Sequence, residues 1–221
     1  MRIKGITDVF FDLDHTLWGF DRNSALAFDK ILKQNHINVD VNDFLYHYVP
    51  INLKYWKLYQ EEKIEKDALR FGRLNDTFLA LGSQVEEATI YKLADDYITH
   101  LTMFNYLIEN TFEILDYLNN RYNLHIITNG FDEVQYKKLT KSNINKYFKT
   151  VTNSEMAGVK KPNPKIFNFA LQLANSNSNQ SIMIGDSYEA DIIGAKNIGM
   201  EVVFLIPVTQ LLIIILNESI I

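Results

Sequence analysis

Short apolar strands alternate with helical patterns in the second half of the chain, and this rhythm constrains the fold more than any other feature. After about residue 105, the strand-like segments are LHIIT (124–128), a short one near TVTN (150–153), SIMIG (181–185) and EVVFLI (201–206). An earlier segment, ITDVFF (6–11), is also too short for a helix and rich in β-branched and aromatic types. Strands that alternate with helices form right-handed β-α-β units. The sequence therefore predicts a doubly wound, Rossmann-like α/β domain whose parallel sheet is covered on both faces.

A long helical block interrupts this domain after its first strand. The block carries helix signals only, with apolar residues at helical spacing and with Pro50 and Gly82 as punctuation between the helices. We expect residues 1–17 and 105–221 to form the α/β domain and residues 18–104 to form an inserted all-helical domain.

Composition excludes several classes of partner and site. A net charge of −5 argues against a nucleic-acid partner, which would call for a basic surface. Without cysteine, the chain has neither disulfides nor cysteine-ligated metals, as suits a cytoplasmic protein. The N-terminus does not resemble a signal peptide, and the most apolar stretch (202–216) is shorter than a membrane span. The unusually apolar residues 207–221, which follow the last predicted strand, are an alternative closing element, a dimer contact or a corrupted terminus, and the sequence leaves monomer and homodimer open.

Polar side chains gather where the predicted strands end. In parallel α/β sheets, ligands bind outside the carboxyl ends of the strands. The residues found there, or in neighbouring loops, are Asp12, Asp14, Thr128, Asn129, Gly130, Lys161, Asp186 and Asp191. The strand ends therefore predict one shared site that contains four acids, one lysine and one hydroxyl.

This set of charges predicts chemistry on phosphate. If the first strand continues through Asp14, then Asp12 and Asp14 lie about 6.5–7 Å apart on one face of the sheet. These carboxylates, with Asp186 and Asp191 nearby, repel one another unless a cation lies between them. Mg²⁺ favours carboxylate, water and phosphate oxygens. A metal and Lys161 together can hold a phosphoryl group, so we expect a Mg²⁺ cofactor and a small phosphorylated metabolite as partner.

Four segments in this order resemble the signature of the haloacid dehalogenase superfamily. They are DLDHT (12–16), the strand that ends in Thr128, the pair Lys161-Pro162 and GDSYEAD (185–191). For a phosphotransferase of that family, the resemblance implies that Asp12 attacks phosphorus and forms an aspartyl-phosphate. It also implies that Asp14 is the general acid and then the general base, and that its backbone carbonyl binds the metal.

The same resemblance assigns the remaining residues. It implies that Thr128, Asn129, Gly130 and Lys161 bind the phosphoryl group, and that Lys161 also stabilises the nucleophile. It further implies that Asp12 and Asp186 bind Mg²⁺ directly and that Asp191 supports the metal site directly or through water. The inserted helical domain would then be the family's cap, which excludes water and selects the substrate.

Longer segments are similar to one subgroup, the noncanonical pyrimidine nucleotidases. These segments are TNGFDEVQYKKL, SEMAGVKKPNPKIF and MIGDSYEADIIGAKNIGM, and the more discriminating part is Asn129-Gly130-Phe131 with Gln135. The similarity implies that the substrates are pyrimidine nucleoside 5'-monophosphates such as UMP, dUMP and dTMP.

Other functions stay open at this point. They are a phosphatase for phosphoglycolate or a sugar phosphate, a β-phosphoglucomutase-like transferase, a carbon–halogen hydrolase and a non-catalytic binding member of the fold. Carbon–halogen hydrolysis needs neither a metal nor an acid at Asp14, so it fits the residues less well. Trp18, Tyr55 and Trp56 either stack on a nucleobase or belong to the core.

Overall fold

The computed structural model describes residues 4–206, which form two compact units. Residues 4–19 and 107–206 form an α/β unit, and residues 20–106 form a helical unit. Each boundary lies two residues from the one expected from the sequence. The apolar segment after Ile206, whose role the sequence left open, lies outside the described residues.

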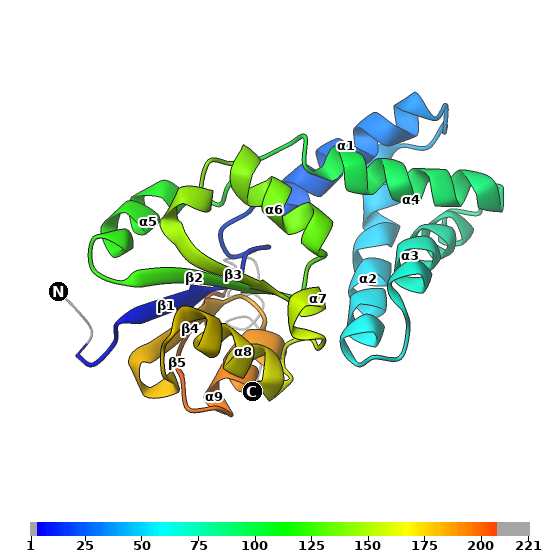
Figure 1. Cartoon of the computed structure of the whole chain (residues 1–221). Helices are drawn as coiled ribbons and strands as arrows, with labels where there is room; N and C mark the ends of the chain where they lie inside the picture. The colour runs from blue at the N-terminus through cyan, green and yellow to red at the C-terminus, as the bar shows by residue number, and fades with distance from the viewer. Residues whose placement is uncertain (1–3, 207–221) are drawn as a thin grey trace, which may run out of the picture. The chain divides into compact units, whose positions relative to one another are not determined.

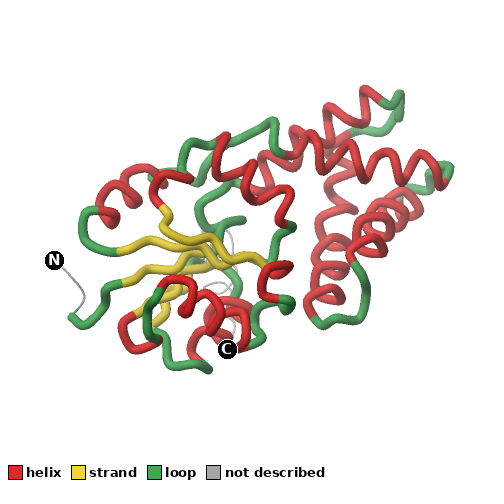
Figure 2. The backbone as a smooth tube through the Cα atoms, viewed as in Figure 1, coloured by secondary structure: helices red, strands yellow, loops and turns green. Residues whose placement is uncertain are grey.

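The α/β unit contains a five-stranded sheet in the order β3-β2-β1-β4-β5. All four strand pairs are parallel, which confirms the predicted doubly wound sheet. The strands, yellow in Figure 2, are β1 (Asp8–Phe11), β2 (Asn123–Thr128), β3 (Phe148–Asn153), β4 (Ser181–Gly185) and β5 (Glu201–Phe204). Because β1 lies at the centre, its carboxyl end is flanked by the ends of β2 and β4.

Helices cover both faces of this sheet. On one face lie α5 (Thr111–Asn119) and α6 (Asp132–Lys141), and on the other lie α8 (Pro164–Ala174) and α9 (Gly194–Lys196) (Figure 1). A short helix, α7 (Ser154–Ala157), follows β3. The core between the sheet and α8 contains Phe10, Ile127, Met183 and Phe167, all fully buried. This burial fixes the strands that deliver the polar residues to the sheet edge.

The helical segment that follows β4 is irregular at its start. Residues Tyr188–Ile193 form a π-helical segment, η3, before α9 begins. The backbone N–H groups of Asp191 and Ile192 both donate to the carbonyl of Ser187, at 2.9 and 3.3 Å. Such widened turns are frequent at functional sites, and this one carries Asp191.

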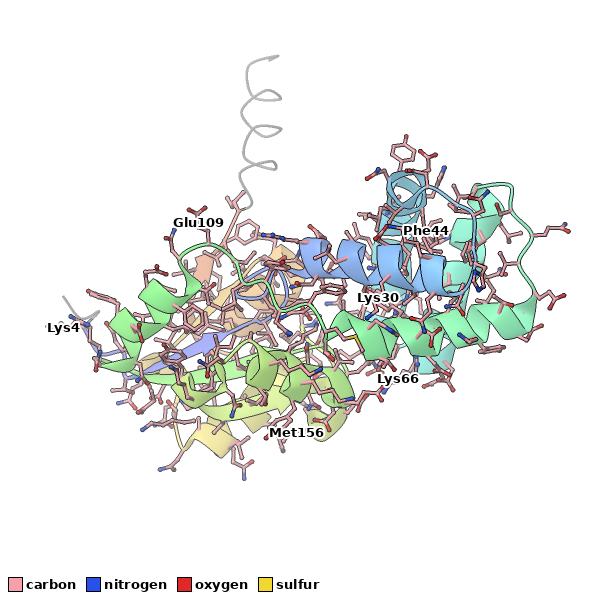
Figure 3. All side chains as sticks on the ribbon, turned by 90° about the horizontal axis from the view of Figure 1, so that it is seen from above. Lys4, Lys30, Phe44, Lys66, Glu109 and Met156 are labelled. Atoms are coloured by element: carbon pink, nitrogen blue, oxygen red, sulfur yellow. The ribbon has the colours of Figure 1, made fainter. Side chains whose placement is uncertain are left out.

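The helical unit contains α1 (Phe20–Gln34), α2 (Val41–Gln60), α3 (Lys66–Ala80) and α4 (Glu87–Leu101). Phe28 of α1 lies at the centre of its core. Its ring centroid is 4.8 Å from that of Phe44, 4.5 Å from that of Tyr48 and 4.3 Å from that of Tyr97. Phe44 is labelled in Figure 3. Aromatic residues of three helices therefore hold this unit together.

The prediction that Pro50 separates two helices is wrong, because α2 runs through it. A proline inside a helix removes one backbone hydrogen bond. Buried residues continue on both sides of it, with Phe44 and Tyr48 before and Asn52 and Tyr59 after, and this packing outweighs the lost bond. Although α2 has 20 residues, no helix within residues 4–206 is long and apolar enough to cross a bilayer.

Candidate active site

The carboxyl ends of β1, β2 and β4 bring the predicted residues to one edge of the sheet. Asp12 follows β1 and its backbone N–H donates to the carbonyl of Ile184 in β4, at 2.9 Å. Thr128 is the last residue of β2, and Asp186 follows the last residue of β4. The pairing of β1 ends at Phe11, so the strand spacing assumed for Asp12 and Asp14 does not extend to Asp14. Instead the chain turns at His15, which has a left-handed φ of 63°.

Three carboxylates lie together at this edge. Asp12, Asp186 and Asp191 each offer one oxygen, and these oxygens lie within 4.8 Å of one another. Lys161 Nζ donates to Asp12 Oδ1 at 2.5 Å, to Asp191 Oδ1 at 2.6 Å and to the carbonyl of Ile127 at 2.8 Å. Three carboxylates against one ammonium leave an excess of two negative charges, and their oxygens are hard donors. This set therefore fits a divalent cation such as Mg²⁺.

The electrostatics of these groups reflect their burial. Burial raises the pKa of Asp12, Lys161 lowers it, and Asp191 and Asp186 raise it again, so the net direction is upward. Burial also raises the pKa of Asp186. Burial lowers the pKa of Lys161, but the charges of Asp12 and Asp191 outweigh this effect and raise it. Lys161 therefore stays protonated, and additional positive charge at the site favours the anionic form of Asp12.

A glycine makes room for Asp191. A Cβ built on Gly185 would lie 2.2 Å from Asp191 Oδ2, so only glycine fits at the end of β4. The same carboxylate oxygen accepts a hydrogen bond from the backbone N–H of Ser187, at 3.0 Å. With its other oxygen on Lys161, Asp191 is held at both ends and is 1% exposed.

Asn129 holds the loop that carries Lys161. Its Nδ2 donates to the carbonyl of Lys161 at 3.0 Å, and its Oδ1 accepts from the N–H of Lys161 at 2.7 Å. The side chain of Asn129, expected to bind phosphate, thus makes a paired contact with the backbone of Lys161. A single asparagine ties the end of β2 to the lysine that contacts Asp12.

Thr128 presents its hydroxyl at the same edge. Its Oγ1 accepts from the backbone N–H of Gly130 at 3.1 Å and from Gln135 Nε2 at 2.7 Å. Both contacts use the oxygen as an acceptor, so the hydroxyl hydrogen is left to donate to a ligand oxygen. This arrangement suits the predicted contact between Thr128 and a phosphoryl group.

Two residues of α6 complete the surroundings of Asp14. Lys138 Nζ donates to Asp14 Oδ1 at 2.6 Å and to Oδ2 at 2.8 Å, and Gln135 Nε2 donates to Oδ2 at 3.1 Å. Sequence reasoning singled out Gln135 only as part of a pattern and did not consider Lys138. Their spacing of three residues, which places both on one face of a helix, was the available signal.

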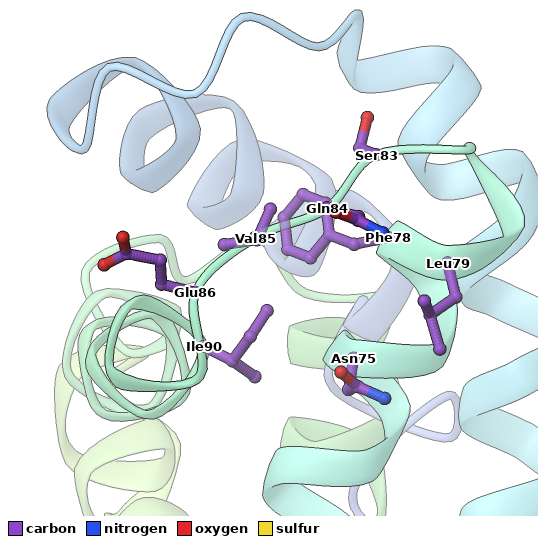
Figure 4. Close-up of a pocket in the computed structure, with 8 residues that line it drawn as sticks. All are labelled: Asn75, Phe78, Leu79, Ser83, Gln84, Val85, Glu86 and Ile90. Atoms are coloured by element: carbon purple, nitrogen blue, oxygen red, sulfur yellow. The ribbon is translucent and has the colours of Figure 1, made fainter.

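The aromatic candidates for base stacking come from both units. Trp18, a candidate for base stacking, belongs to the α/β unit and is fully buried. Tyr55 of α2 donates its hydroxyl to Asp76 of α3, at 2.8 Å. A cavity of about 410 Å³ between α3 and α4 is lined by Phe78, Glu86 and Ile90, among others (Figure 4). It carries one acidic and no basic side chain, so it does not suit a phosphate.

Comparison with known proteins agrees with this geometry. The chain is 31% identical over 201 residues to the pyrimidine 5'-nucleotidase PynA of Streptococcus pneumoniae, a match that covers 90% of this chain and 83% of that protein. It is 32% identical over 201 residues to a glyceraldehyde 3-phosphate phosphatase of Pyrococcus abyssi, covering 89% and 79%. The solved structure of the HAD-hydrolase YfnB of Bacillus subtilis, bound to magnesium, matches with a TM-score of 0.83 and 28% identity, covering 90% of this chain and 88% of that chain.

These similarities extend across the sheet edge described above. The sequence matches the family of haloacid dehalogenase-like hydrolases over residues 9–205, which include every residue of the candidate site. The acidic cluster at the end of a parallel sheet, the lysine within it and this match lead to one conclusion: the chain belongs to the haloacid dehalogenase-like hydrolase family.

Proposed function

We propose that the protein is a Mg²⁺-dependent phosphomonoesterase that acts through an aspartyl-phosphate on Asp12. The observation that carries the proposal is the contact of Lys161 with Asp12 inside the three-carboxylate cluster. A buried lysine beside a carboxylate holds that carboxylate in place and offers positive charge to an incoming phosphoryl group. The residues required for both the nucleophile and its electrostatic support thus meet at one strand end.

In the first step, an Asp12 carboxylate oxygen attacks phosphorus and the bond from phosphorus to the leaving alcohol breaks. Protonated Asp14 gives its proton to the alcohol oxygen, so a neutral alcohol leaves. Thr128 donates a hydrogen bond to the phosphoryl group, and Lys161 stabilises the charge on its oxygens. In the second step, Asp14 takes a proton from water as that water attacks phosphorus, which releases phosphate and regenerates the Asp12 carboxylate.

The residues that would hold Mg²⁺ are Asp12, Asp186 and Asp191, with the backbone carbonyl of Asp14. When bound there, the cation supplies positive charge that balances the carboxylates and the phosphoryl oxygens. Thr16 supports this group, because its Oγ1 donates to Asp186 Oδ1 at 3.3 Å.

We propose pyrimidine nucleoside 5'-monophosphates as the substrates. The relative named as a pyrimidine 5'-nucleotidase supports this choice, as do the residues that follow Thr128. A triose or other sugar phosphate is the second candidate, supported by the relative named as a glyceraldehyde 3-phosphate phosphatase. We further propose that the helical unit is a cap that selects between such substrates and that the enzyme works in the cytoplasm.

The test is phosphate release by the purified chain from UMP, dUMP, dTMP, glyceraldehyde 3-phosphate, phosphoglycolate and p-nitrophenyl phosphate, with Mg²⁺ or with EDTA. We expect Mg²⁺-dependent release that is fastest from the pyrimidine nucleotides and absent from Asp12→Asn. Faster release from the sugar phosphates would replace the nucleotide assignment. A folded wild-type protein without release from any phosphomonoester would overturn the proposed activity and favour a binding function.

A further inference from the structure

Lys138 is buried in an unusual place for a lysine. The residue is 2% exposed, and its ammonium lies 4.4 Å from the centroid of the Trp18 ring, which is itself fully buried. It donates hydrogen bonds to both carboxylate oxygens of Asp14, at 2.6 and 2.8 Å. An ammonium on the face of an indole and against both oxygens of one carboxylate is strongly restrained.

Burying this charge has an energetic cost. Burial lowers the pKa of Lys138, while the charges of Asp14 and Asp12 oppose that effect. Buried ion pairs contribute little net stability compared with apolar side chains of similar volume. Lys138 is therefore poorly explained by stability alone, and its contact with Asp14 points to a role at the site.

Gln135 holds Asp14 from the same helix face. Its Nε2 donates to Asp14 Oδ2 and to Thr128 Oγ1, so one amide connects the acid to the phosphate-facing hydroxyl. The side chain crosses directly over Gly130, where a Cβ would lie 1.8 Å from Gln135 Nε2. Gly130 therefore has a steric role, because the absence of a side chain there lets Gln135 reach both Asp14 and Thr128.

The three contacts treat the two oxygens of Asp14 differently. Among residues 4–206, Oδ2 accepts from both Lys138 and Gln135, whereas Oδ1 accepts from Lys138 alone. A carboxylate oxygen has two lone-pair directions. Oδ2 is therefore filled, and Oδ1 retains one direction in which it can carry and transfer a proton.

We propose that Lys138 is a positioning residue that fixes the carboxylate of Asp14 so that Oδ1 is the oxygen that exchanges a proton with the leaving group. The inference rests on the proposed phosphatase function and goes beyond it, because it assigns a role to a residue of α6. In this role Lys138 needs no contact with the substrate. It acts through Asp14, and Gln135 provides the second restraint.

Substrates with different leaving groups test this role, because loss of a lysine with only a structural role would slow the turnover of all of them alike. An alkoxide leaves poorly without a proton, so turnover of a nucleoside 5'-monophosphate or another alkyl phosphate depends on Asp14. The p-nitrophenolate anion is stable and leaves without one. General acid–base catalysis contributes about 10²–10⁴-fold, and in the first step, where the leaving group departs, this factor applies to the alkyl substrate only.

The experiment compares kcat/KM of Lys138→Met on dUMP, or on the best alkyl phosphate, and on p-nitrophenyl phosphate, because kcat/KM reports the steps up to departure of the leaving group and excludes the shared hydrolysis of the aspartyl-phosphate. We expect kcat/KM on the alkyl phosphate to fall by about 10²-fold or more, with a fall below about tenfold on p-nitrophenyl phosphate. Asp14→Asn should show the same pattern. The double variant should be no slower than Asp14→Asn alone, because both changes remove one function. Lys138→Gln, which keeps an N–H donor group without the charge, replaces Lys138→Met if the latter does not fold.

Lys137→Met is the matched control, since Lys137 is exposed on the same helix and loses the same charge. It should leave both substrates unaffected. Equal losses on both substrates, no loss on either, or additive losses in the double variant would overturn the role of Lys138 while the phosphatase function stands. Absence of wild-type turnover on both substrates would overturn the phosphatase function and this inference with it.

Discussion

The carboxylate of Asp191 packs so closely against Gly185 that a Cβ there would lie 2.2 Å from Oδ2. The side chain of Asp191, on η3, therefore fills the space that a side chain at residue 185 would need. A methyl group at residue 185 would displace the acid from Lys161 and from the carboxylate cluster.

We expect Gly185→Ala to lower Mg²⁺-dependent phosphatase activity by at least about tenfold, since a misplacement of roughly 1 Å in an active site can cost about 10²-fold. Steady-state kinetics at several Mg²⁺ concentrations measure the loss. Asp191→Asn is the matched comparison and should show a similarly weakened response to Mg²⁺. Wild-type kinetics in Gly185→Ala would show that Asp191 need not occupy its present position.

Lys161 lies between two buried carboxylates, so its removal leaves their charges uncompensated. We expect Lys161→Met to lower the free energy of unfolding by about 3–5 kcal/mol near neutral pH, measured by urea unfolding without metal. Burial already raises the pKa of Asp12, and loss of the ammonium raises it further. Folding therefore favours protonated Asp12, and the stability linked to this proton is lost as pH rises through the folded-state pKa.

The cost of Lys161→Met should accordingly be smaller at about pH 5 than at about pH 8. Lys160→Met, at the neighbouring residue, is the control for loss of one positive charge. A cost that does not change with pH would contradict the assignment of uncompensated carboxylates.

Binding of Mg²⁺ can be measured without turnover. A ligand that binds only the folded state raises its stability by an amount that grows with ligand concentration. We expect Mg²⁺ to raise the melting temperature of the wild type and to give a clearly smaller rise in Asp186→Asn. An equal rise in both proteins would place the cation away from Asp186.

His125 in β2 makes stability depend on pH away from the active site. Its Nε2 lies 3.1 Å from Asp8 Oδ1, its Nδ1 lies 2.8 Å from Thr150 Oγ1, and its ring stacks on Phe10. Burial lowers the pKa of His125, although the hydrogen bond and charge of Asp8 oppose this shift. The folded state therefore favours the neutral ring, with Nε2–H donating to Asp8 and Nδ1 accepting from Thr150.

The stability that comes from neutral His125 is present above the unfolded pKa of about 6.5 and is lost as pH falls from there through the folded pKa. We expect the free energy of unfolding of the wild type to decrease from about pH 7.5 to about pH 5. His125→Gln, which keeps a donor and an acceptor, should show a smaller decrease. Parallel pH profiles for the two proteins would assign the dependence to other groups.

The sequence predicted the parallel sheet and the residues at its edge for a physical reason. In this fold the carboxyl ends of the strands meet, so Asp12, Thr128 and Asp186 could be placed together from strand order alone. The close contact of Lys161 with Asp12 spans 149 residues, and it could be expected only because the lysine-proline pair stands at a recognisable point of the chain.

Other features depend on packing that no local pattern reveals. Lys138 looks like an ordinary exposed lysine beside Lys137, and only the fold brings it to Asp14, 124 residues away. The continuity of α2 through Pro50 depends on buried residues on either side of it. The turn at His15 ends the strand spacing that the sequence suggested for Asp14.

Two segments of the α/β unit pair with each other: the one where the chain leaves this unit and the one where it returns. Trp18 and Leu107 form an antiparallel bridge, and the N–H of Ile108 donates to the carbonyl of Leu17, at 2.9 Å. The two ends of residues 20–106 therefore lie next to each other, and this stretch contains no strand of the sheet. We therefore expect that a single genetic exchange can replace this stretch without changing any of the residues that follow β1, β2 and β4 at the sheet edge.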